Sequence, residues 1–174
     1  MSQSPAQRGN NPRGIVEVSG QLDARGKRFG LVAARFNERV VSTLIDGALD
    51  CLRRHGAKDD DLVLVRVPGA WEIPAALRVL AQRGQGDQGF DALVALGVVI
   101  RGETPHFDYV CSQCASGITA VSSQFDLPIG MGVLTCDTPT QAQERAGGKA
   151  GNKGWEAAEA ALEMADLLPR LRSL

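Results

Sequence analysis

The sequence predicts an α/β domain built around a mostly parallel sheet. Short apolar runs alternate along the chain with segments in which apolar residues recur at helical spacing, and this alternation is typical of strand–helix–strand units. The run Ala92–Ile100 is almost entirely apolar, as expected for a parallel strand that helices cover on both faces. Right-handed crossovers between such strands place helices on both sides of the sheet.

The composition is that of a folded domain with no preference for nucleic acid. The chain has 174 residues, of which 44% are hydrophobic and 22% are charged, and its net charge is -1. This length predicts one domain, which we place at residues 15–174. Residues 1–14 are rich in Ser, Gln, Asn, Pro and Gly and are expected to form a flexible N-terminal tail. The near-neutral charge and an aromatic content of 5% argue against nucleic-acid or membrane-surface partners.

No segment predicts export or membrane insertion. The longest apolar run, Ala92–Ile100, is far shorter than the roughly 20 residues that span a bilayer. Residues 1–14 lack the apolar centre of a signal peptide. We therefore expect a cytoplasmic protein whose four cysteines are free thiols.

The N-terminal third of the chain predicts two strands and a helix. Gly14–Val18 is a short strand candidate, and the apolar stretch Arg28–Ala34 predicts a buried strand. Glu38–His55 has the pattern of an amphipathic helix, with Asn37 as its N-cap and Gly56 at its end. The residues expected on its buried face are Val41, Leu44, Ile45, Ala48 and Leu52.

The central third continues the alternation. Leu62–Val67 predicts a strand that Pro68-Gly69 ends. Trp71–Gln82 returns to helical spacing, and Pro74 lies early enough in it to be tolerated in the first turn. The apolar run Ala92–Ile100 is the next strand.

The last third predicts one more strand and three helices. A helix is expected at His106–Gln124 and a strand at Pro128–Thr135. Two further helices are expected at Thr140–Ala146 and Gly154–Leu168, the second ending just before Pro169 because proline disrupts a helix interior.

The carboxyl ends of the strands are where ligands bind in open parallel sheets. This rule selects a set of segments that should meet at one edge of the sheet: Ala34–Asn37, Pro68–Glu72, Arg101–His106 and Thr135–Asp137.

Two glycine-rich segments resemble nucleotide-binding motifs in their residue pattern but not in their structural context. Gly84–Gly89 matches G-x-G-x-x-G, but it follows a helix and precedes a strand, so we expect a surface loop. Ala146–Gly154 has no Gly-Lys-Ser/Thr at the P-loop offset and predicts a turn between helices. A second hypothesis for this turn is that Arg145, Lys149 and Lys153 gather around an anion.

Cys111 and Cys114 form a C-x-x-C pair. Structural zinc needs a second pair of ligands, whereas Cys51 and Cys136 are single and distant in the sequence. The local pattern places Cys111 and Cys114 inside a helix, unlike a redox motif at a helix start. Free thiols that are buried or half-buried are the favoured interpretation.

Several residues on the expected edge suit catalysis, although each also has a structural explanation. His106 can transfer protons or cap a helix. The amides of Arg101–Thr104 can bind a phosphate or form an ordinary turn. Glu72 can accept hydrogen bonds from sugar-like hydroxyls or favour the helix dipole. Phe36 can stack on a flat ring or pack in the core.

Taken together, these segments resemble one family. The matching stretches are Arg35–Asn37, Pro68–Pro74, Gly97–Val110 and Glu144–Gly154. In order and spacing they are similar to the lumazine synthases of riboflavin biosynthesis, and the resemblance covers Phe29–Leu168.

The resemblance implies a flavodoxin-like three-layer α/β/α sandwich with a four-stranded parallel sheet. It also implies the condensation of 5-amino-6-(D-ribitylamino)uracil with 3,4-dihydroxy-2-butanone 4-phosphate to 6,7-dimethyl-8-ribityllumazine, phosphate and water. The family uses no metal and no organic cofactor. Because the amine belongs to the substrate, no lysine of the protein is needed for a Schiff base.

The resemblance also assigns roles to residues. His106 would shuttle protons. The residues implied for the pyrimidine and ribityl group are Phe36, Asn37, Ala70, Trp71, Glu72, Val98, Val99, Ile100 and Met131. Those implied for the butanone phosphate are Glu103, Thr104 and Arg145, with Lys149 and Lys153 as further candidates.

The family forms homo-oligomers whose sites lie between subunits. The segments of Met131 and Arg145 would complete the site of an adjacent subunit, in a pentamer that can assemble further into decamers or sixty-subunit shells. No insertion interrupts Gly147–Gly154, so the sequence is compatible with assembly into a sixty-subunit shell. Riboflavin synthase is a further candidate partner. Met131 departs from the family, which often has Phe at this position.

Two other functions fit the sequence less well. A non-catalytic flavin or pterin binder would have a Ser/Thr-rich phosphate loop after its first strand, where this chain has Ala33–Asn37. A shell protein without catalysis would have no need of Phe36, Glu72, His106 and Arg145.

Overall fold

The computed structural model describes residues 15–84 and 89–174. The tail expected at residues 1–14 lies outside the described residues. Residues 85–88, which belong to the expected loop Gly84–Gly89, also lie outside them.

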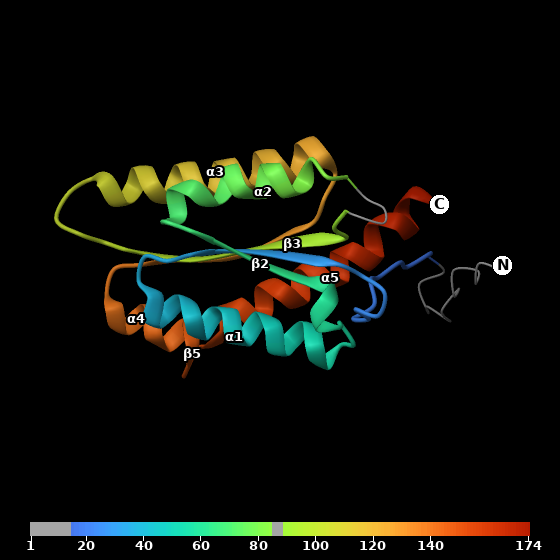
Figure 1. The fold of residues 1–174 in the computed structure, drawn as a ribbon, viewed down its shortest axis with the longest axis horizontal. Helices are drawn as coiled ribbons and strands as arrows, with labels where there is room; N and C mark the ends of the chain where they lie inside the picture. Colours follow the sequence, from blue (N-terminus) through green and yellow to red (C-terminus); the bar gives the residue numbers. More distant parts are fainter. Residues whose placement is uncertain (1–14, 85–88) are drawn as a thin grey trace.

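A four-stranded parallel sheet forms the centre of the molecule, in the order β2-β1-β3-β4 (Figure 1). Its strands are β1 (Phe29–Ala34), β2 (Leu62–Val67), β3 (Ala92–Ile100) and β4 (Ile129–Cys136). Every residue of β1 is buried, because this strand has neighbours on both edges and helices on both faces. The prediction of these four strands and of their parallel arrangement is confirmed.

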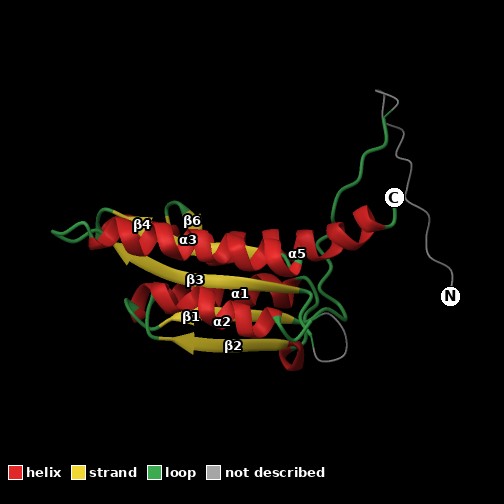
Figure 2. Cartoon of the chain, turned by 90° about the horizontal axis from the view of Figure 1, so that it is seen from above, coloured by secondary structure: helices red, strands yellow, loops and turns green. Residues whose placement is uncertain are grey.

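Helices cover both faces of the sheet and complete a three-layer sandwich (Figures 1 and 2). The helices are α1 (Glu38–Arg54), α2 (Ile73–Ala81), α3 (His106–Phe125), α4 (Pro139–Arg145) and α5 (Lys153–Arg172). The apolar cluster on one face joins the sheet to α2 and α3, and the cluster on the other face joins it to α1, α4 and α5. The flavodoxin-like α/β/α class is therefore confirmed.

Several short elements complete the chain. Single 3₁₀ turns occur at η1 (Asp59–Asp61) and η2 (Ala70–Glu72). The helix predicted at Trp71–Gln82 therefore starts as a 3₁₀ turn, and its α-helical part begins at Ile73. The turn predicted at Ala146–Gly154 contains an antiparallel pair, β5 (Ala146–Gly148) and β6 (Gly151–Asn152).

Two local predictions are wrong, and a third is correct in position only. Residues 15–18 of the segment Gly14–Val18 form no strand, because no strand of the described chain pairs with them. Helix α5 continues through Pro169 to Arg172, because the proline φ fits a helix and only one hydrogen bond is lost near its end. Asn37 is the N-cap residue of α1 as predicted, but it adopts a left-handed conformation with φ 60° and its side chain makes no capping bond.

Two glycines let α5 approach its neighbours closely. A Cβ at Gly130 would overlap the carbonyl oxygen of Ala157, and a Cβ at Gly154 would overlap that of Leu44. Glycine at both positions therefore fixes how α5 lies on β4 and α1.

Among the described residues, none of the helices combines the length and hydropathy that crossing a bilayer requires.

Candidate active site

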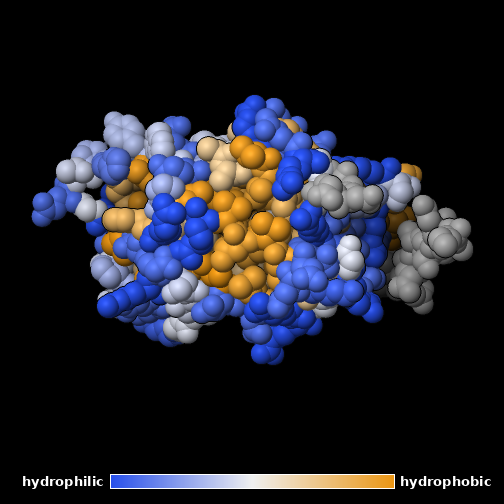
Figure 3. Space-filling view, viewed as in Figure 1, coloured by the Kyte–Doolittle hydropathy of each residue, from blue (hydrophilic) through white to orange (hydrophobic). Residues whose placement is uncertain are grey.

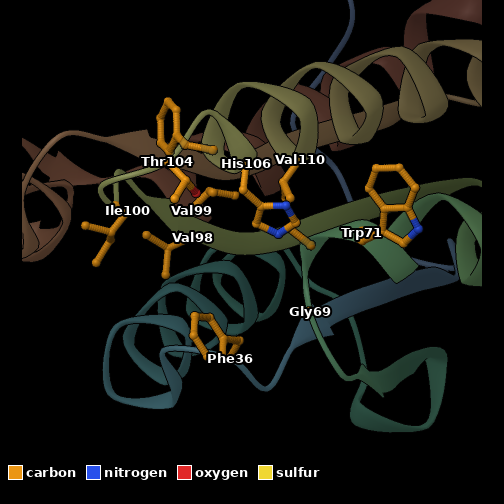
Figure 4. A pocket seen from close by; sticks show the side chains of 12 residues that line it. Phe36, Gly69, Trp71, Val98, Val99, Ile100, Thr104, His106 and Val110 are labelled. Atoms are coloured by element: carbon orange, nitrogen blue, oxygen red, sulfur yellow. The ribbon is translucent and has the colours of Figure 1, made fainter.

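A cavity of about 290 Å³ opens at the carboxyl ends of β1, β2 and β3 (Figure 4). Its lining includes many of the residues predicted from the sequence: Phe36, Ala70, Trp71, Val98, Val99, Ile100, Thr104 and His106. The parallel sheet thus brings three separate segments to one place, as the rule for ligand sites in open sheets predicts. The fourth segment, Thr135–Asp137, does not line the cavity, because β4 lies beyond β3 at the edge of the sheet.

One side of the cavity presents exposed aromatic rings. Phe36 follows β1 and is 71% exposed, while Trp71 in η2 is 56% exposed. Exposed aromatic side chains at a cavity suit the face of a flat ligand, because stacking buries apolar area that is otherwise in contact with water. Ala70 and Val98 are buried below them and form a rigid wall.

The other side of the cavity is formed by the start of α3. Pro105 is in the N-cap position and no side chain caps the helix. The Asp108 amide donates to the Pro105 carbonyl oxygen at 3.0 Å. The N–H groups before it at the helix start have no intrahelical acceptor, and together with the helix dipole they favour an anion. Thr104 and His106 line the cavity at this end, whereas the exposed Glu103 adjoins the cavity without lining it.

His106 is placed to move protons. Its ring points into the space between the end of β3 and the segment from Gly69 to Trp71 (Figure 4). No described residue forms a hydrogen bond with the ring, so both ring nitrogens are available to a ligand or to water.

Glu72 and Asn37 make contacts within the protein that their sequence pattern did not predict. One carboxylate oxygen of Glu72, Oε2, accepts a 2.8 Å hydrogen bond from the Gly69 amide. Its other oxygen is left for a ligand. The Nδ2 group of Asn37 donates to the Val98 carbonyl oxygen at 3.4 Å. Neither residue lines the cavity, and both instead hold its walls together.

The remaining predicted residues lie outside the cavity of their own chain. Met131 on β4 is 51% exposed. Arg145, at the end of α4, donates from Nη1 to the Gln141 carbonyl oxygen at 3.1 Å. Two lysines near it are engaged with carboxylates, in the pairs Lys149–Glu144 (2.8 Å) and Lys153–Glu156 (2.6 Å).

The cysteines are free thiols, as predicted. Burial raises the pKa of Cys51 to about 12 and that of Cys114 to about 11. Burial also raises the pKa of Cys111 and of Cys136. All four are therefore protonated at neutral pH and are poor nucleophiles. No group of three or more potential ligands in the described part of the chain is arranged to hold a metal ion.

Gly69 and Gly102 line the cavity and belong to segments that the sequence predicts at this edge. Phe107 and Val110 line it as well, although the sequence analysis names neither as a candidate site residue. The signal for Val110 is present in the sequence, because His106 lies one helical turn before it and the two therefore share a face of α3. The same spacing does not indicate Phe107.

The comparisons with known proteins agree with this geometry. A family model described as 6,7-dimethyl-8-ribityllumazine synthase matches residues 26–169. A protein of that name from Aquifex aeolicus is 53% identical over 153 residues, which cover 88% of this chain and 97% of the relative. A protein of the same name from Salinibacter ruber is 54% identical, over 90% of this chain and 97% of the relative. Another, from Desulfatibacillum aliphaticivorans, is 49% identical, over 89% of this chain and 97% of the relative. The chain therefore belongs to the 6,7-dimethyl-8-ribityllumazine synthase family.

Proposed function

We propose that this protein condenses 5-amino-6-(D-ribitylamino)uracil with 3,4-dihydroxy-2-butanone 4-phosphate to form 6,7-dimethyl-8-ribityllumazine, the penultimate step of riboflavin biosynthesis. Membership of the family and relatives that share about half of its residues support this transferase activity. The observation that carries the proposal is one cavity with exposed aromatic rings on one side and an uncapped helix start on the other. The two sides suit a flat pyrimidine and a phosphate.

The pyrimidine would bind on the aromatic side. Phe36 stacks on its ring, Trp71 and Ala70 enclose it, and the backbone of Val98–Ile100 contacts its polar edge. The ribityl hydroxyls reach the free carboxylate oxygen of Glu72. Asn37, bonded to the Val98 carbonyl, keeps the Phe36 loop against β3. The positions of Phe36, Ala70, Trp71 and Val98–Ile100 in the cavity lining support these roles, whereas Glu72 and Asn37 are assigned from their hydrogen bonds to Gly69 and Val98.

The phosphate of the second substrate would bind at the start of α3. Thr104 and the adjacent Glu103 supply backbone N–H groups, and the helix dipole attracts the dianion. With both substrates in place, the pyrimidine amine lies next to the ketone carbon. Holding the two reactants in this way accounts for most of the catalysis, because it removes the entropic cost of their encounter.

His106 would then carry the protons. The amine attacks the ketone carbon, a C–N bond forms and water leaves as the imine is produced. The carbon between the imine and the phosphate-bearing carbon then loses a proton, and the C–O bond to phosphate breaks, which leaves an enol. The enol takes up a proton at its terminal carbon and becomes a ketone, and the second nitrogen closes the ring on this carbonyl with loss of another water. An imidazole with its ring in the cavity can accept and return a proton at each of these steps.

The family indicates an oligomeric assembly, and we propose that it is built from pentamers. The cavity of one chain lacks a cationic side chain among its lining residues. Met131, Arg145, Lys149 and Lys153 would complete the site of the adjacent subunit, with Arg145 paired to the phosphate. Arg145 suits this role because a guanidinium binds phosphate through two parallel hydrogen bonds.

Exposed apolar surface at the edge of the sheet supports an assembly. Figure 3 shows a hydrophobic area over β2, between the helices of the two layers. Leu64 on β2 is 42% exposed and Val79 on α2 is 62% exposed. An open strand edge with apolar side chains is typical of an interface. Larger decamers or sixty-subunit shells, a contact with riboflavin synthase and a cytoplasmic location are further proposals.

The proposed function is tested by mixing both substrates with the purified protein and following lumazine formation by absorbance. Turnover without added metal or cofactor is the expected result. A folded, oligomeric sample that forms no lumazine would contradict the proposal and would favour the flavin-binder or shell hypothesis.

A further inference from the structure

Arg101 follows β3 at the beginning of the loop that leads to α3, but it does not line the cavity. Its Nε donates to Asp137 Oδ1 at 2.9 Å, and its Nη1 lies 3.3 Å from Asp108 Oδ1. The guanidinium carbon lies 4.1 Å from the ring centre of Phe107, which does line the cavity. Two carboxylates and an aromatic face thus hold this guanidinium, which is 44% exposed, on the outer side of the loop and away from the cavity lining.

The partners of Arg101 connect it to α4. The backbone amide of Arg101 donates to the Cys136 carbonyl oxygen at 2.9 Å, so the β3–β4 ladder continues to the residue beside Asp137. The Asp137 amide in turn donates to Gln141 Oε1 at 2.8 Å. The Gln141 carbonyl oxygen accepts the 3.1 Å bond from Arg145 described above. One run of hydrogen bonds therefore links the loop before α3 to Arg145.

We propose that Arg101 and Asp137 are positioning residues for phosphate recognition. Their ion pair fastens the loop Gly102–Thr104, which holds no capping side chain of its own, to the beginning of α4. The pair thereby holds the free N–H groups of the loop in place. Through Gln141 it also orients the helix that ends in Arg145. This inference rests on the proposed function, because it concerns phosphate binding in the proposed sites: the loop serves the cavity of its own chain, and Arg145 serves that of the adjacent subunit.

An ion pair remote from the cavity should have no effect on phosphate binding. The pair Arg54–Asp50 on α1 provides such a comparison for Arg101–Asp137. Arg54 Nε lies 2.9 Å from Asp50 Oδ1 on the exposed side of α1, with both side chains more than half exposed. The Arg101–Asp137 pair has the same length, with side-chain exposures of 44% and 67%. Asp50→Asn is therefore the control for removing one surface carboxylate.

The test is a double-mutant cycle of Arg101→Gln and Asp137→Asn. Asp137→Asn should raise KM for the butanone phosphate and the Kd for inorganic phosphate about fivefold, while KM for the pyrimidine changes less than about twofold. In the Arg101→Gln background the same substitution should add little, because the pair is already broken. Asp137→Glu should restore most of the phosphate affinity, and Asp50→Asn should change nothing.

Other results overturn the inference. Equal losses for both substrates, independent effects of the two substitutions, or a loss that follows a lowered Tm would each indicate a merely structural pair. A failure of the proposed function is distinguishable, because it would appear as absent turnover in the unmodified protein. The inorganic phosphate titration still decides the positioning role in that case: an unchanged Kd in Asp137→Asn overturns it.

Discussion

Two regions of the molecule carry the family's motifs, and the fold treats them differently. The first is the cavity, where the ends of β1, β2 and β3 and the start of α3 converge within one chain. The second is the cationic segment, which we define as Arg145, Lys149 and Lys153. It lies at the end of α4, in the β5–β6 turn and at the start of α5, outside the cavity lining.

The difference follows from what each region needs. A parallel sheet forms an apolar cavity wall without further elements, because its buried apolar strands all end at the same edge. Cations must remain hydrated or paired until an anion arrives, and here Lys149 and Lys153 each have a carboxylate partner. This difference agrees with our proposal that one chain assembles the apolar half of a site and presents the cationic half to another copy.

The largest effect is expected at Gly154, which joins the cationic segment to α1. A Cβ in Gly154→Ala would overlap the Leu44 carbonyl oxygen, and backbone cannot yield as a side chain can. We expect the free energy of unfolding to fall by about 3 kcal/mol, measured by urea denaturation. Gly102→Ala is the control, since a Cβ there meets no atom within 4 Å. Equal stability of the two variants would show that α1 and α5 are not held at this contact.

Arg145→Ala should separate the two regions functionally. Removal of a charge-assisted phosphate contact costs about 2 kcal/mol, which corresponds to roughly a thirtyfold rise in KM for the butanone phosphate. KM for the pyrimidine should change little. Steady-state kinetics with each substrate varied in turn measures both values, and Arg54→Ala serves as a distant control. Equal losses for the two substrates would remove the reason for assigning Arg145 to the phosphate.

Phe36→Ala should produce the opposite selectivity with a smaller magnitude. The exposed ring contributes stacking area to the pyrimidine, and its loss should weaken that substrate about tenfold. The affinity for inorganic phosphate should remain as in the unmodified protein, and so should Tm, because the ring is 71% exposed. A larger effect on phosphate than on the pyrimidine would contradict this division of the cavity.

The smallest effect concerns the buried thiol of Cys51. Burial raises its pKa from 9.0 to about 12, so between these values the unfolded chain loses the proton and the folded chain keeps it. Stability is therefore unaffected below about pH 9 and falls as the pH rises above it, by roughly 1 kcal/mol per pH unit from this group. Urea denaturation at pH 8 and pH 10.5 should show a shallower decline in Cys51→Ala. The same slope in both proteins would contradict the assignment.

The strands and the cavity could be predicted because their signals are local. The apolar run Ala92–Ile100 and the polar residues after it are contiguous, and the rule for parallel sheets then places them together. The helix spacing within His106–Phe125 is equally local. The roles drawn from the resemblance, including those of Arg145 and Met131, remain predictions.

Features that depend on distant partners could not be predicted in this way. The segment Gly14–Val18 has the composition of a strand, but a strand also needs a neighbour to accept its hydrogen bonds. Pro169 predicts a helix end, yet α5 continues past it. The bond of Arg101 to Asp137 spans 36 residues, and no periodicity in the sequence marks it. The αL conformation of Asn37 likewise arises from its place between β1 and α1.

The central claim is that the site is shared between adjacent subunits, with His106 from one chain and Arg145 from the next. Complementation between His106→Ala and Arg145→Ala tests it most directly. The assay is run at a butanone phosphate concentration well below its KM, where the raised KM of Arg145→Ala and the missing imidazole of His106→Ala should each leave only a few per cent of the activity. A co-expressed mixture should regain about a quarter of the wild-type activity, because in random pentamers that share of interfaces combines two intact halves. A mixture no more active than the separate variants would contradict the claim, since both residues would then serve the same chain's site.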